Sequence, residues 1–297
     1  WAIQIPGREA TEIRCQYVLD LSRPEVQDYA YECVAKILRS ANIKYVKWDM
    51  NRQLSDLGST YLDKDSQQEL FHRYVLGMYA MQERLVQEFP DLLLENCSGG
   101  GARFDPGMLY YSPQIWCSDD TDAIERLEIQ EGTALIYPLC SMGAHVSVCP
   151  NHTVTPFTTR GHVALAGTFG YELDITKLPE EERKLIPEQT AMYHKYHELI
   201  RDGEYYRILS YRENHRSDCW AVASEDKNEV LVTYVQVLAQ VNMPSRKVRL
   251  RGFDPAKKYC LEGTDEVYSG ELMNAGFRMK DFWGDFVSRL YHFVAVD

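Results

Sequence analysis

Short apolar runs alternate with longer amphipathic segments through roughly the first two thirds of this 297-residue chain. Runs bounded by turn residues indicate strands, whereas apolar positions three and four residues apart indicate helices. The predicted strands are Gln16–Leu21, Lys44–Met50, Leu92–Cys97, Gln114–Cys117, His145–Cys149 and Gly167–Leu173. The predicted helices are Pro24–Ser40, Ser66–Phe89, Thr121–Leu135, Pro156–Ala166 and Pro179–Asp202.

Strands that alternate with helices predict βα units around a parallel sheet. The glycine run Gly99–Gly101 lacks the GxGxxG spacing of a dinucleotide-binding turn, because position 104 is Phe. We therefore expect an α/β fold of the (β/α)8 TIM-barrel type rather than a doubly wound sheet. A barrel of this type has eight strands in about 250 residues. The six strands predicted here imply that the first strands of the barrel lie outside this chain.

The pattern changes after Gly203 to short strands separated by turns that contain Gly, Asp and Asn. The predicted strands are Arg207–Ser210, Cys219–Ser224, Glu229–Val237, Lys247–Leu250, Lys258–Leu261, Leu272–Met279 and Phe286–Val296. Consecutive short strands of this kind predict an antiparallel β-sandwich domain. We expect a partial barrel over residues 1–202 and an antiparallel β domain over residues 203–297.

The charge balance argues against two classes of partner. Asp and Glu number 44 against 32 Lys and Arg, a net charge of −12, whereas nucleic acids and anionic membranes bind basic surfaces. No stretch reaches the roughly 18 apolar residues of a membrane-spanning helix. The eight cysteines occur singly and without a CxxC pair, which is typical of a reducing compartment and predicts a cytoplasmic location. Cys149 and His152 are two potential metal ligands without evident partners, so we predict no metal and no cofactor.

Carboxylates dominate the ends of the predicted strands, where barrel enzymes carry their active sites. They are Asp20, Asp49, Glu95, Asp119, Asp120 and Asp122, accompanied by the cations Arg14, Lys47 and Arg103. Two carboxylates facing each other across a cleft are what glycoside hydrolysis requires, one at the anomeric carbon and one at the leaving oxygen. A single Asp at a strand end is more often a turn or helix-cap residue. These considerations leave Asp119, Asp120 and Asp122 as three alternatives for the second carboxylate.

Three motifs resemble the α-galactosidases of glycoside hydrolase family 36. The segment KYVKWDMNR at Lys44–Arg52 is similar to the family's nucleophile strand, and ENCSGGGARFD at Glu95–Asp105 matches its ENCxGGGxRxD loop. The segment WCSDDTDAIER at Trp116–Arg126 is similar to its acid/base segment. Shorter matches follow in the same order, at Met142–His145, Pro150–His152 and Phe169–Asp174.

The resemblance implies a retaining hydrolysis in two steps. Asp49 would be the nucleophile that forms a covalent galactosyl–enzyme, and Asp119, rather than its two acidic neighbours, would be the acid/base. Lys47 lies two residues before Asp49 and therefore on the same face of the strand. The residues that the resemblance assigns to galactose binding are Arg14, Lys47, Asn51, Cys97, Gly99 and Trp48, although strand alternation turns Trp48 toward the barrel wall.

The expected substrates are terminal non-reducing α-D-galactosyl residues, as in melibiose and the raffinose family of oligosaccharides. A galactosyl transferase of the raffinose- or stachyose-synthase type and a noncatalytic carbohydrate-binding relic are the alternatives. Members of the family carry an N-terminal β domain and the first barrel strands before the matching region, and they commonly form tetramers. The resemblance thus implies a homo-oligomeric full-length enzyme, of which the 297 residues alone would be poorly active.

Overall fold

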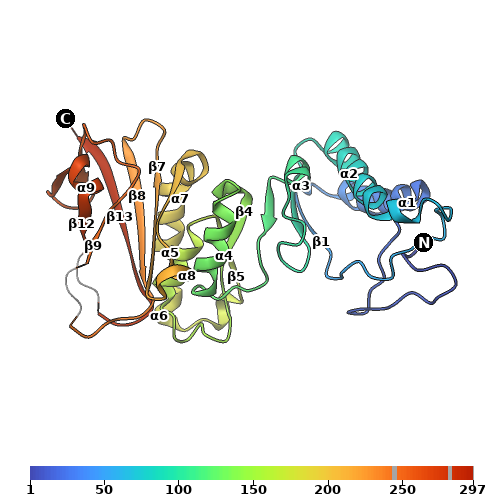
Figure 1. Ribbon diagram of the computed structural model, residues 1–297, viewed down its shortest axis with the longest axis horizontal. Helices are drawn as coiled ribbons and strands as arrows, with labels where there is room; N and C mark the ends of the chain where they lie inside the picture. Colours follow the sequence, from blue (N-terminus) through green and yellow to red (C-terminus); the bar gives the residue numbers. More distant parts are fainter. Residues whose placement is uncertain (243–245, 280–282, 297) are drawn as a thin grey trace. The chain divides into compact units, whose positions relative to one another are not determined.

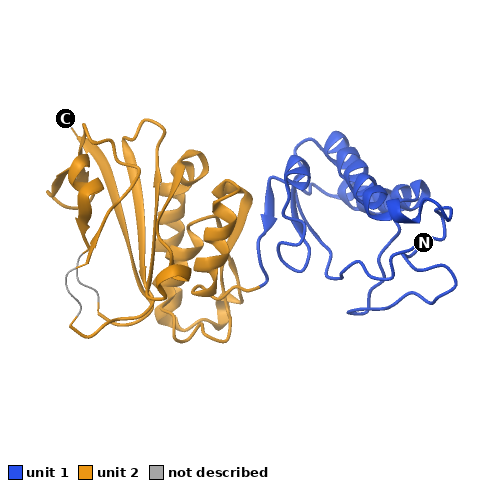
Figure 2. Cartoon of the chain, in the orientation of Figure 1, with its two compact units in different colours: residues 1–119 blue, residues 120–297 orange. Residues whose placement is uncertain are grey.

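The computed structural model describes residues 1–242, 246–279 and 283–296. The chain divides into two compact units, residues 1–119 and residues 120–297 (Figure 2). Among the described residues, no helix combines the length and the apolar character needed to cross a lipid bilayer.

The first unit is a parallel sheet covered by helices (Figure 1). Its elements are α1 (Pro24–Ser40), β1 (Tyr45–Asp49), η1 (Gln67–Glu69), α2 (Leu70–Glu88), β2 (Leu93–Cys97), α3 (Pro106–Tyr111) and β3 (Gln114–Trp116). Strand β2 lies between β1 and β3 and runs parallel to both, with Tyr45 opposite Leu93 and Glu95 opposite Gln114. The βα alternation predicted for this part of the chain is confirmed, and the carboxyl ends of the three strands meet at one edge of the sheet.

The two long helices of this unit follow the predicted patterns closely. Helix α1 has the predicted bounds, because Pro24 fits the first helical turn and Glu25 suits its positive end. Helix α2 buries its stripe of apolar residues at spacings of three and four, as predicted: Leu70, Tyr74, Met78, Met81 and Leu85. This stripe and the buried residues of α1 belong to one hydrophobic core, which also includes Leu94 of β2 and Ile115 of β3. The core fixes the back of the sheet and leaves its carboxyl edge to the loops.

The predicted strand Gln16–Leu21 is wrong. The segment makes two isolated antiparallel bridges, Leu19 with Ala2 and Gln16 with Ile13, instead of joining the parallel sheet. Arg14 and Cys15 adopt left-handed backbone angles, φ 54° and 58°, in a tight turn that places Ile13 and Gln16 in mutual backbone hydrogen bonds. The apolar residues that alternate along this segment are explained by the bridge to Ala2 and by burial of Val18 in the core of the first unit.

The second unit begins with further α/β structure. Its elements are α4 (Glu125–Ala134), η2 (Leu139–Ser141), β4 (Met142–Ser147), α5 (Phe157–Ala164), β5 (Thr168–Glu172), η3 (Ile175–Lys177), α6 (Glu180–Arg183) and α7 (Ile186–Asp202). Strands β4 and β5 are parallel. The predicted helix Pro179–Asp202 is two helices, because Pro187 lacks the N–H that a helix interior needs and instead occupies the first turn of α7.

The rest of this unit is antiparallel β structure, as the sequence pattern predicts. Its elements are β6 (Glu204–Leu209), α8 (Tyr211–Asn214), β7 (Ser217–Ala223), β8 (Glu229–Gln236), β9 (Lys247–Val248), β10 (Lys258–Leu261), β11 (Val267–Ser269), α9 (Gly270–Gly276), β12 (Phe277–Arg278) and β13 (Val287–Val296). Six strands form one antiparallel sheet in the order β11-β10-β13-β8-β7-β6, and β12 pairs with β9 in a second sheet. The fold class predicted from the sequence, partial parallel α/β structure followed by antiparallel β structure, is confirmed.

One predicted strand of this domain, Leu272–Met279, is mostly helix. The Ser269 hydroxyl caps α9 by accepting a hydrogen bond from the backbone N–H of Leu272, at 3.2 Å. A side-chain acceptor at this position satisfies an N–H that a helix start leaves unpaired, and so favours helix over strand. Strand structure resumes only at Phe277.

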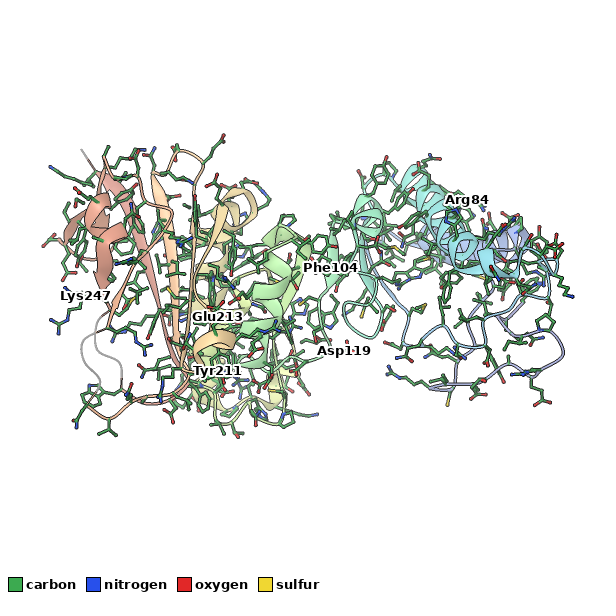
Figure 3. All side chains as sticks on the ribbon, viewed as in Figure 1. Arg84, Phe104, Asp119, Tyr211, Glu213 and Lys247 are labelled. Atoms are coloured by element: carbon green, nitrogen blue, oxygen red, sulfur yellow. The ribbon has the colours of Figure 1, made fainter. Side chains whose placement is uncertain are left out.

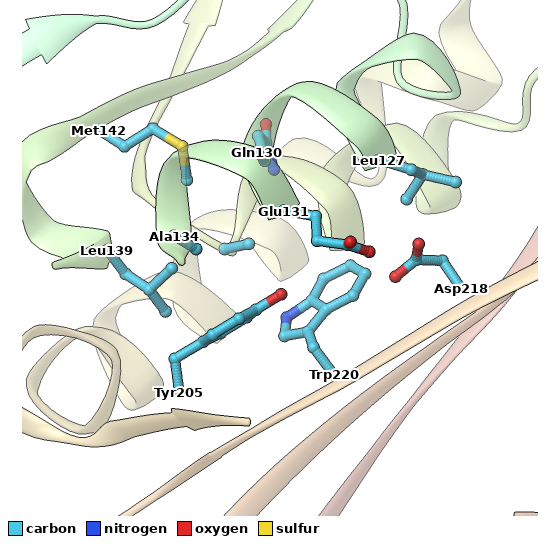
Figure 4. A pocket seen from close by; sticks show the side chains of 10 residues that line it. Leu127, Gln130, Glu131, Ala134, Leu139, Met142, Tyr205, Asp218 and Trp220 are labelled. Atoms are coloured by element: carbon cyan, nitrogen blue, oxygen red, sulfur yellow. The ribbon is translucent and has the colours of Figure 1, made fainter. Parts of the chain in front are cut away.

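Two buried carboxyl groups lie between helix α4 and the antiparallel sheet. Glu131 on α4 and Asp218 on β7 point toward one another above Trp220 (Figure 4). Glu131 Oε1 accepts hydrogen bonds from Arg207 and Ser210, at 3.1 and 3.0 Å, whereas Asp218 Oδ2 accepts from the backbone N–H of Tyr211 at 2.8 Å. Burial first, and the charge of Glu131 after it, raise the pKa of Asp218 to about 7.

We expect Asp218 to make the protein less stable as pH rises from about 4 to 7. The folded state holds a proton on Asp218 in that window that the unfolded chain has released, so the free energy of unfolding falls with pH. Asp218→Asn keeps an oxygen for the Tyr211 N–H and removes the titration. Thermal unfolding should show the Asn variant gaining on the native protein as pH rises, by on the order of 1–3 kcal/mol above pH 7. Parallel curves for the two proteins would contradict this account.

Candidate active site

Asp49 ends strand β1 at the carboxyl edge of the parallel sheet. Exposure alternates along the strand, so that Lys47 and Asp49 share the more exposed face while Val46 and Trp48 pack against the core of the first unit. This is the period of two that a pleated strand imposes on its side chains. The predicted shared face of Lys47 and Asp49 is therefore observed.

Two side chains flank the Asp49 carboxylate. The Asn51 amide donates a hydrogen bond to Oδ2 at 2.6 Å, and Cys97 lies opposite Asp49 in the register of β1 and β2. Burial of the Cys97 thiol and the adjacent negative charge raise the pKa of Cys97 to about 11. The thiol consequently stays protonated at neutral pH and does not serve as a nucleophile.

Lys47 presents its ammonium group on the same face. The Nζ atom lies 3.6 Å from Glu95 Oε1 and 4.6 Å from the ring centroid of Trp116. These partners belong to β2 and β3, so the side chain leans across the sheet from the strand that carries Asp49. Its positive charge therefore lies on the face of the sheet on which Asp49 ends β1.

The glycine loop after β2 packs directly on the segment that carries Asp119. Gly100 has φ +87°, and a Cβ atom on it would lie 2.9 Å from the backbone nitrogen of Asp119. A Cβ atom on Gly101 would lie 2.5 Å from the carbonyl oxygen of Cys117. Only glycine permits this approach of two backbones. The loop thus fixes where Asp119 follows β3 (Figure 3).

The structure distinguishes the three acidic residues that the sequence leaves as alternatives. Asp122 is buried, and its Oδ1 accepts the backbone N–H groups of Ile124 and Glu125 at 2.8 and 3.3 Å, which caps the turn that leads into α4. Asp120 Oδ1 accepts the backbone N–H of Asp122 at 3.0 Å. Asp119 is exposed, and within the described residues no hydrogen bond engages its carboxylate. Two of the carboxylates therefore have structural roles, and Asp119 is available to a ligand.

We expect Asp122→Ala to lower stability by about 1 kcal/mol, the usual cost of losing a cap, and to lower by less than about tenfold the kcat/KM of the glycoside hydrolysis that the family resemblance implies. If Asp119 is the general acid, as the resemblance implies, Asp119→Ala should lower the same kcat/KM roughly 100- to 10,000-fold. Steady-state kinetics with thermal unfolding of both variants checks the contrast. An Asp122 variant that folds normally but is as inactive as the Asp119 variant would overturn the assignment.

A cavity of about 410 Å³ lies beside the segments that follow β1 and β2. Arg14, Asn51 and Gly99 from the predicted set line it, together with apolar side chains of the segment after β1, of α2 and of α3. Gly99 has φ +52°, and the space where its Cβ atom would lie is open. The predicted residues are thus found in three places: Lys47, Asn51 and Cys97 surround Asp49, Arg14 and Gly99 line the cavity with Asn51, and Trp48 lies on the opposite face of β1.

Arg103 is a residue whose part in the site the sequence leaves undefined. Its Nη2 atom donates to the carbonyl oxygens of Trp48 and Cys97, at 3.0 and 2.6 Å, and thereby ties the ends of β1 and β2 together. Burial lowers the pKa of Arg103. The sequence signal that could have identified Arg103 is its place in the GGGxR motif. The turn itself requires the glycines but does not require a cation two residues after them.

Metal chemistry receives no support from the part of the chain that the structure describes, in which no three His, Cys, Asp or Glu side chains group as metal ligands. Neither Cys149 nor His152 gains such partners. The Cys149 thiol donates to Asp122 Oδ2 at 3.5 Å, and His152 Nδ1 contacts the Cys149 carbonyl oxygen. Both contacts stabilise the loop that follows β4.

Comparison with known families gives two matches that follow one another along the chain. The model described as Melibiase matches residues 1–203, and the model described as Glycosyl hydrolase family 36 C-terminal domain matches residues 217–293.

Several characterised proteins are similar over the whole chain. The alpha-galactosidase AgaA of Geobacillus stearothermophilus is 48% identical over 300 residues, and the alpha-galactosidase Mel36A of Lactobacillus acidophilus is 48% identical over 301. A variant of AgaA crystallised in complex with raffinose has a TM-score of 0.95 at 47% identity, covering all of this chain and 42% of that one. Another was crystallised with stachyose. The matches to AgaA and Mel36A extend over the whole of this chain, which spans only 41% of the length of each of these relatives.

Proposed function

The chain belongs to the melibiase family of glycosyl hydrolases, and on that premise we propose that it supplies the catalytic centre of a retaining α-galactosidase. The full-length protein would hydrolyse terminal non-reducing α-D-galactosyl residues. The observation that carries this proposal is the pair of strand ends at one edge of the sheet. Asp49 ends β1 and accepts a hydrogen bond from Asn51, and Asp119 follows β3, where its backbone packs against the glycine loop that follows β2.

Asp49 is the nucleophile of the first step. One of its carboxylate oxygens attacks the anomeric carbon from the β face as the bond to the leaving oxygen breaks, and Asp119 gives its proton to that oxygen. The product is a β-linked galactosyl–Asp49 ester. The hydrogen bond from Asn51 supports this role, because it favours one orientation of the carboxylate before substrate binds.

Asp119 acts as base in the second step. Its carboxylate takes a proton from a water molecule whose oxygen attacks the anomeric carbon from the α face, and Asp49 leaves as a free carboxylate. The two steps invert the centre twice, so the configuration is retained. Strands two places apart in a sheet lie roughly 10 Å apart, and the retaining mechanism that we propose requires the two carboxyl groups to converge from β1 and β3 to about 5–5.5 Å.

The galactose pocket is formed by the residues around these two carboxylates. Lys47 supplies an ammonium group and Asn51 an amide on the Asp49 side, while Arg14 and Gly99 line the adjoining cavity. Cys97 and Gly99 present a wall without bulky side chains. Trp48 serves this pocket as part of the wall behind β1, since its side chain packs in the core.

We propose a division of labour along the chain as well. Residues 1–202 form the catalytic part and residues 203–297 a separate C-terminal domain, a division supported by the family matches, which end at 203 and resume at 217. A homo-oligomer, a tetramer by the family resemblance, and a cytoplasmic location are proposals of the same kind. None of the eight cysteines forms a disulfide bond, which suits a reducing compartment.

Raffinose and stachyose, found bound to variants of AgaA, are the natural substrates we propose. The decisive test follows the hydrolysis of 4-nitrophenyl α-galactoside and raffinose by the full-length protein with proton NMR. α-Galactose as the first-formed anomer supports the proposal, whereas β-galactose would refute the retaining mechanism. Release of nitrophenol without an equivalent of free galactose, in the presence of a sugar acceptor, would identify a transferase. Binding of galactose without turnover would identify a carbohydrate-binding protein.

A further inference from the structure

A buried carboxylate lies in the sheet one step below the proposed nucleophile. Glu95 is in the middle of β2, is 1% exposed, and is paired in register with Lys47 of β1. Asp49 and Cys97 form the corresponding pair two residues further along the same strands. Because side chains two residues apart share a face, Glu95 and Lys47 form the layer directly beneath Asp49 and Cys97.

The neighbouring strands fix the orientation of this carboxylate. Its Oε2 atom accepts one hydrogen bond from the Tyr45 hydroxyl on β1 and another from the Gln114 amide on β3, the latter at 3.1 Å. With Oε2 held from both sides, Oε1 is directed to the Lys47 ammonium at 3.6 Å. Because the Glu95 side chain is already ordered, it loses little further conformational entropy when its carboxylate pairs with the flexible lysine side chain.

Lys47 is thereby confined to a narrow range of positions. Its four-carbon side chain is flexible by itself, but Glu95 attracts the Nζ atom from β2 and the ring of Trp116 lies 4.6 Å away on β3. A cation is attracted both to a carboxylate and to the face of an aromatic ring. The ammonium is therefore placed on the active face before any ligand arrives.

We propose that Glu95 is a positioning residue of the active site, which acts on galactose only through Lys47. This inference rests on the proposed function, because it assigns Lys47 to galactose binding. It predicts that loss of the Glu95 charge matters only while the Lys47 ammonium is present. A carboxylate that merely stabilised the sheet would affect the protein equally with or without that ammonium.

A double-mutant cycle in the full-length protein separates these two roles. The dissociation constant of D-galactose, measured by calorimetry, is expected to rise roughly 10- to 100-fold in Glu95→Gln, the range for a misplaced binding group. In the Lys47→Met background the same change should alter it by less than about threefold. The loss of kcat/KM on 4-nitrophenyl α-galactoside should follow the same pattern and appear mainly in KM. Equal factors in both backgrounds would overturn the inference.

Two further variants keep the test informative. If Glu95→Gln fails to fold, Tyr45→Phe removes one donor from the carboxylate while leaving both charges. It should weaken galactose binding by roughly threefold to tenfold, and only in the presence of Lys47; an equal effect without Lys47 would refute the proposal. Glu131→Gln is the matched control, since it neutralises a buried glutamate of the other compact unit that also pairs with a cation. It should leave galactose affinity unchanged within about twofold.

Failure of the inference and failure of the proposed function give different results. Galactose binding is measured without turnover, so an inactive full-length protein that binds galactose refutes α-galactosidase activity while the cycle still decides the role of Glu95. An active protein with an additive cycle refutes the role of Glu95 and leaves the proposed function intact. A full-length protein that neither binds galactose nor hydrolyses galactosides refutes both.

Discussion

Asp49→Ala is expected to lower kcat/KM on α-galactosides by about 10⁴-fold or more, the size of effect seen when an essential member of a catalytic group is removed. The physical reason is that no other carboxylate in the described residues of β1 and β2 accepts the Asn51 amide and faces Cys97 as Asp49 does. Without the nucleophile the covalent intermediate cannot form. Steady-state kinetics on 4-nitrophenyl α-galactoside measures the loss.

Asp49→Asn is the matched variant, because the amide keeps an oxygen for the hydrogen bond from Asn51 but is a very poor nucleophile. It should fold with the stability of the native protein and be as inactive as the alanine variant. Retention of more than about 1% of the native activity by both variants, after exclusion of contaminating enzyme, would show that Asp49 is not the nucleophile.

Gly100→Ala is expected to disable the acid/base as severely as a substitution of Asp119 itself. The new Cβ atom would lie 2.9 Å from the Asp119 backbone nitrogen and 2.9 Å from Ser118 Cα, closer than van der Waals contact permits, so one of the two backbones must move. A displacement of about 1 Å in a catalytic group costs on the order of 10²-fold in rate. The left-handed φ of +87° adds strain of about 1 kcal/mol to the loop.

A second glycine separates strain from displacement. Gly263 in the C-terminal domain also has a left-handed φ, +76°, but nothing lies within 4 Å of the position of its Cβ atom. Gly263→Ala should lower the melting temperature as the Gly100 variant does and leave kcat/KM unchanged within about twofold. If both variants lose activity equally, or if the Gly100 variant keeps full activity, the proposed contact between the glycine loop and Asp119 has no catalytic importance.

The features that could be predicted from the sequence are those set by local pattern. The stripe of apolar residues gives α2, Pro24 gives the start of α1, and the alternation along β1 places Lys47 beside Asp49 with Trp48 on the other face. Each follows from helix or strand periodicity in a single segment. The resemblance to a family then selects which carboxylates carry chemistry.

Features that depend on contacts between segments could not be predicted from the sequence. The alternation at Gln16–Leu21 is that of a strand, but two isolated bridges satisfy it. The partnership of Lys47 with Glu95 requires the register of β1 and β2, and nothing in either segment alone encodes that register. The cap formed by Asp122 depends on where α4 begins, and the pattern placed that start four residues early, at Thr121 instead of Glu125.

The rescue of two alanine variants by azide tests the central claim most directly. Sodium azide is added to Asp49→Ala and to Asp119→Ala in the full-length protein with 4-nitrophenyl α-galactoside, and the galactosyl azide is identified by NMR. If Asp49 is the nucleophile and Asp119 the acid/base, the first variant yields the β-azide, because azide takes the place of the carboxylate. The second yields the α-azide, because azide attacks the galactosyl–enzyme. An α-azide from the Asp49 variant, or no rescue of the Asp119 variant while an Asp120 or Asp122 variant is rescued, would contradict the assignment.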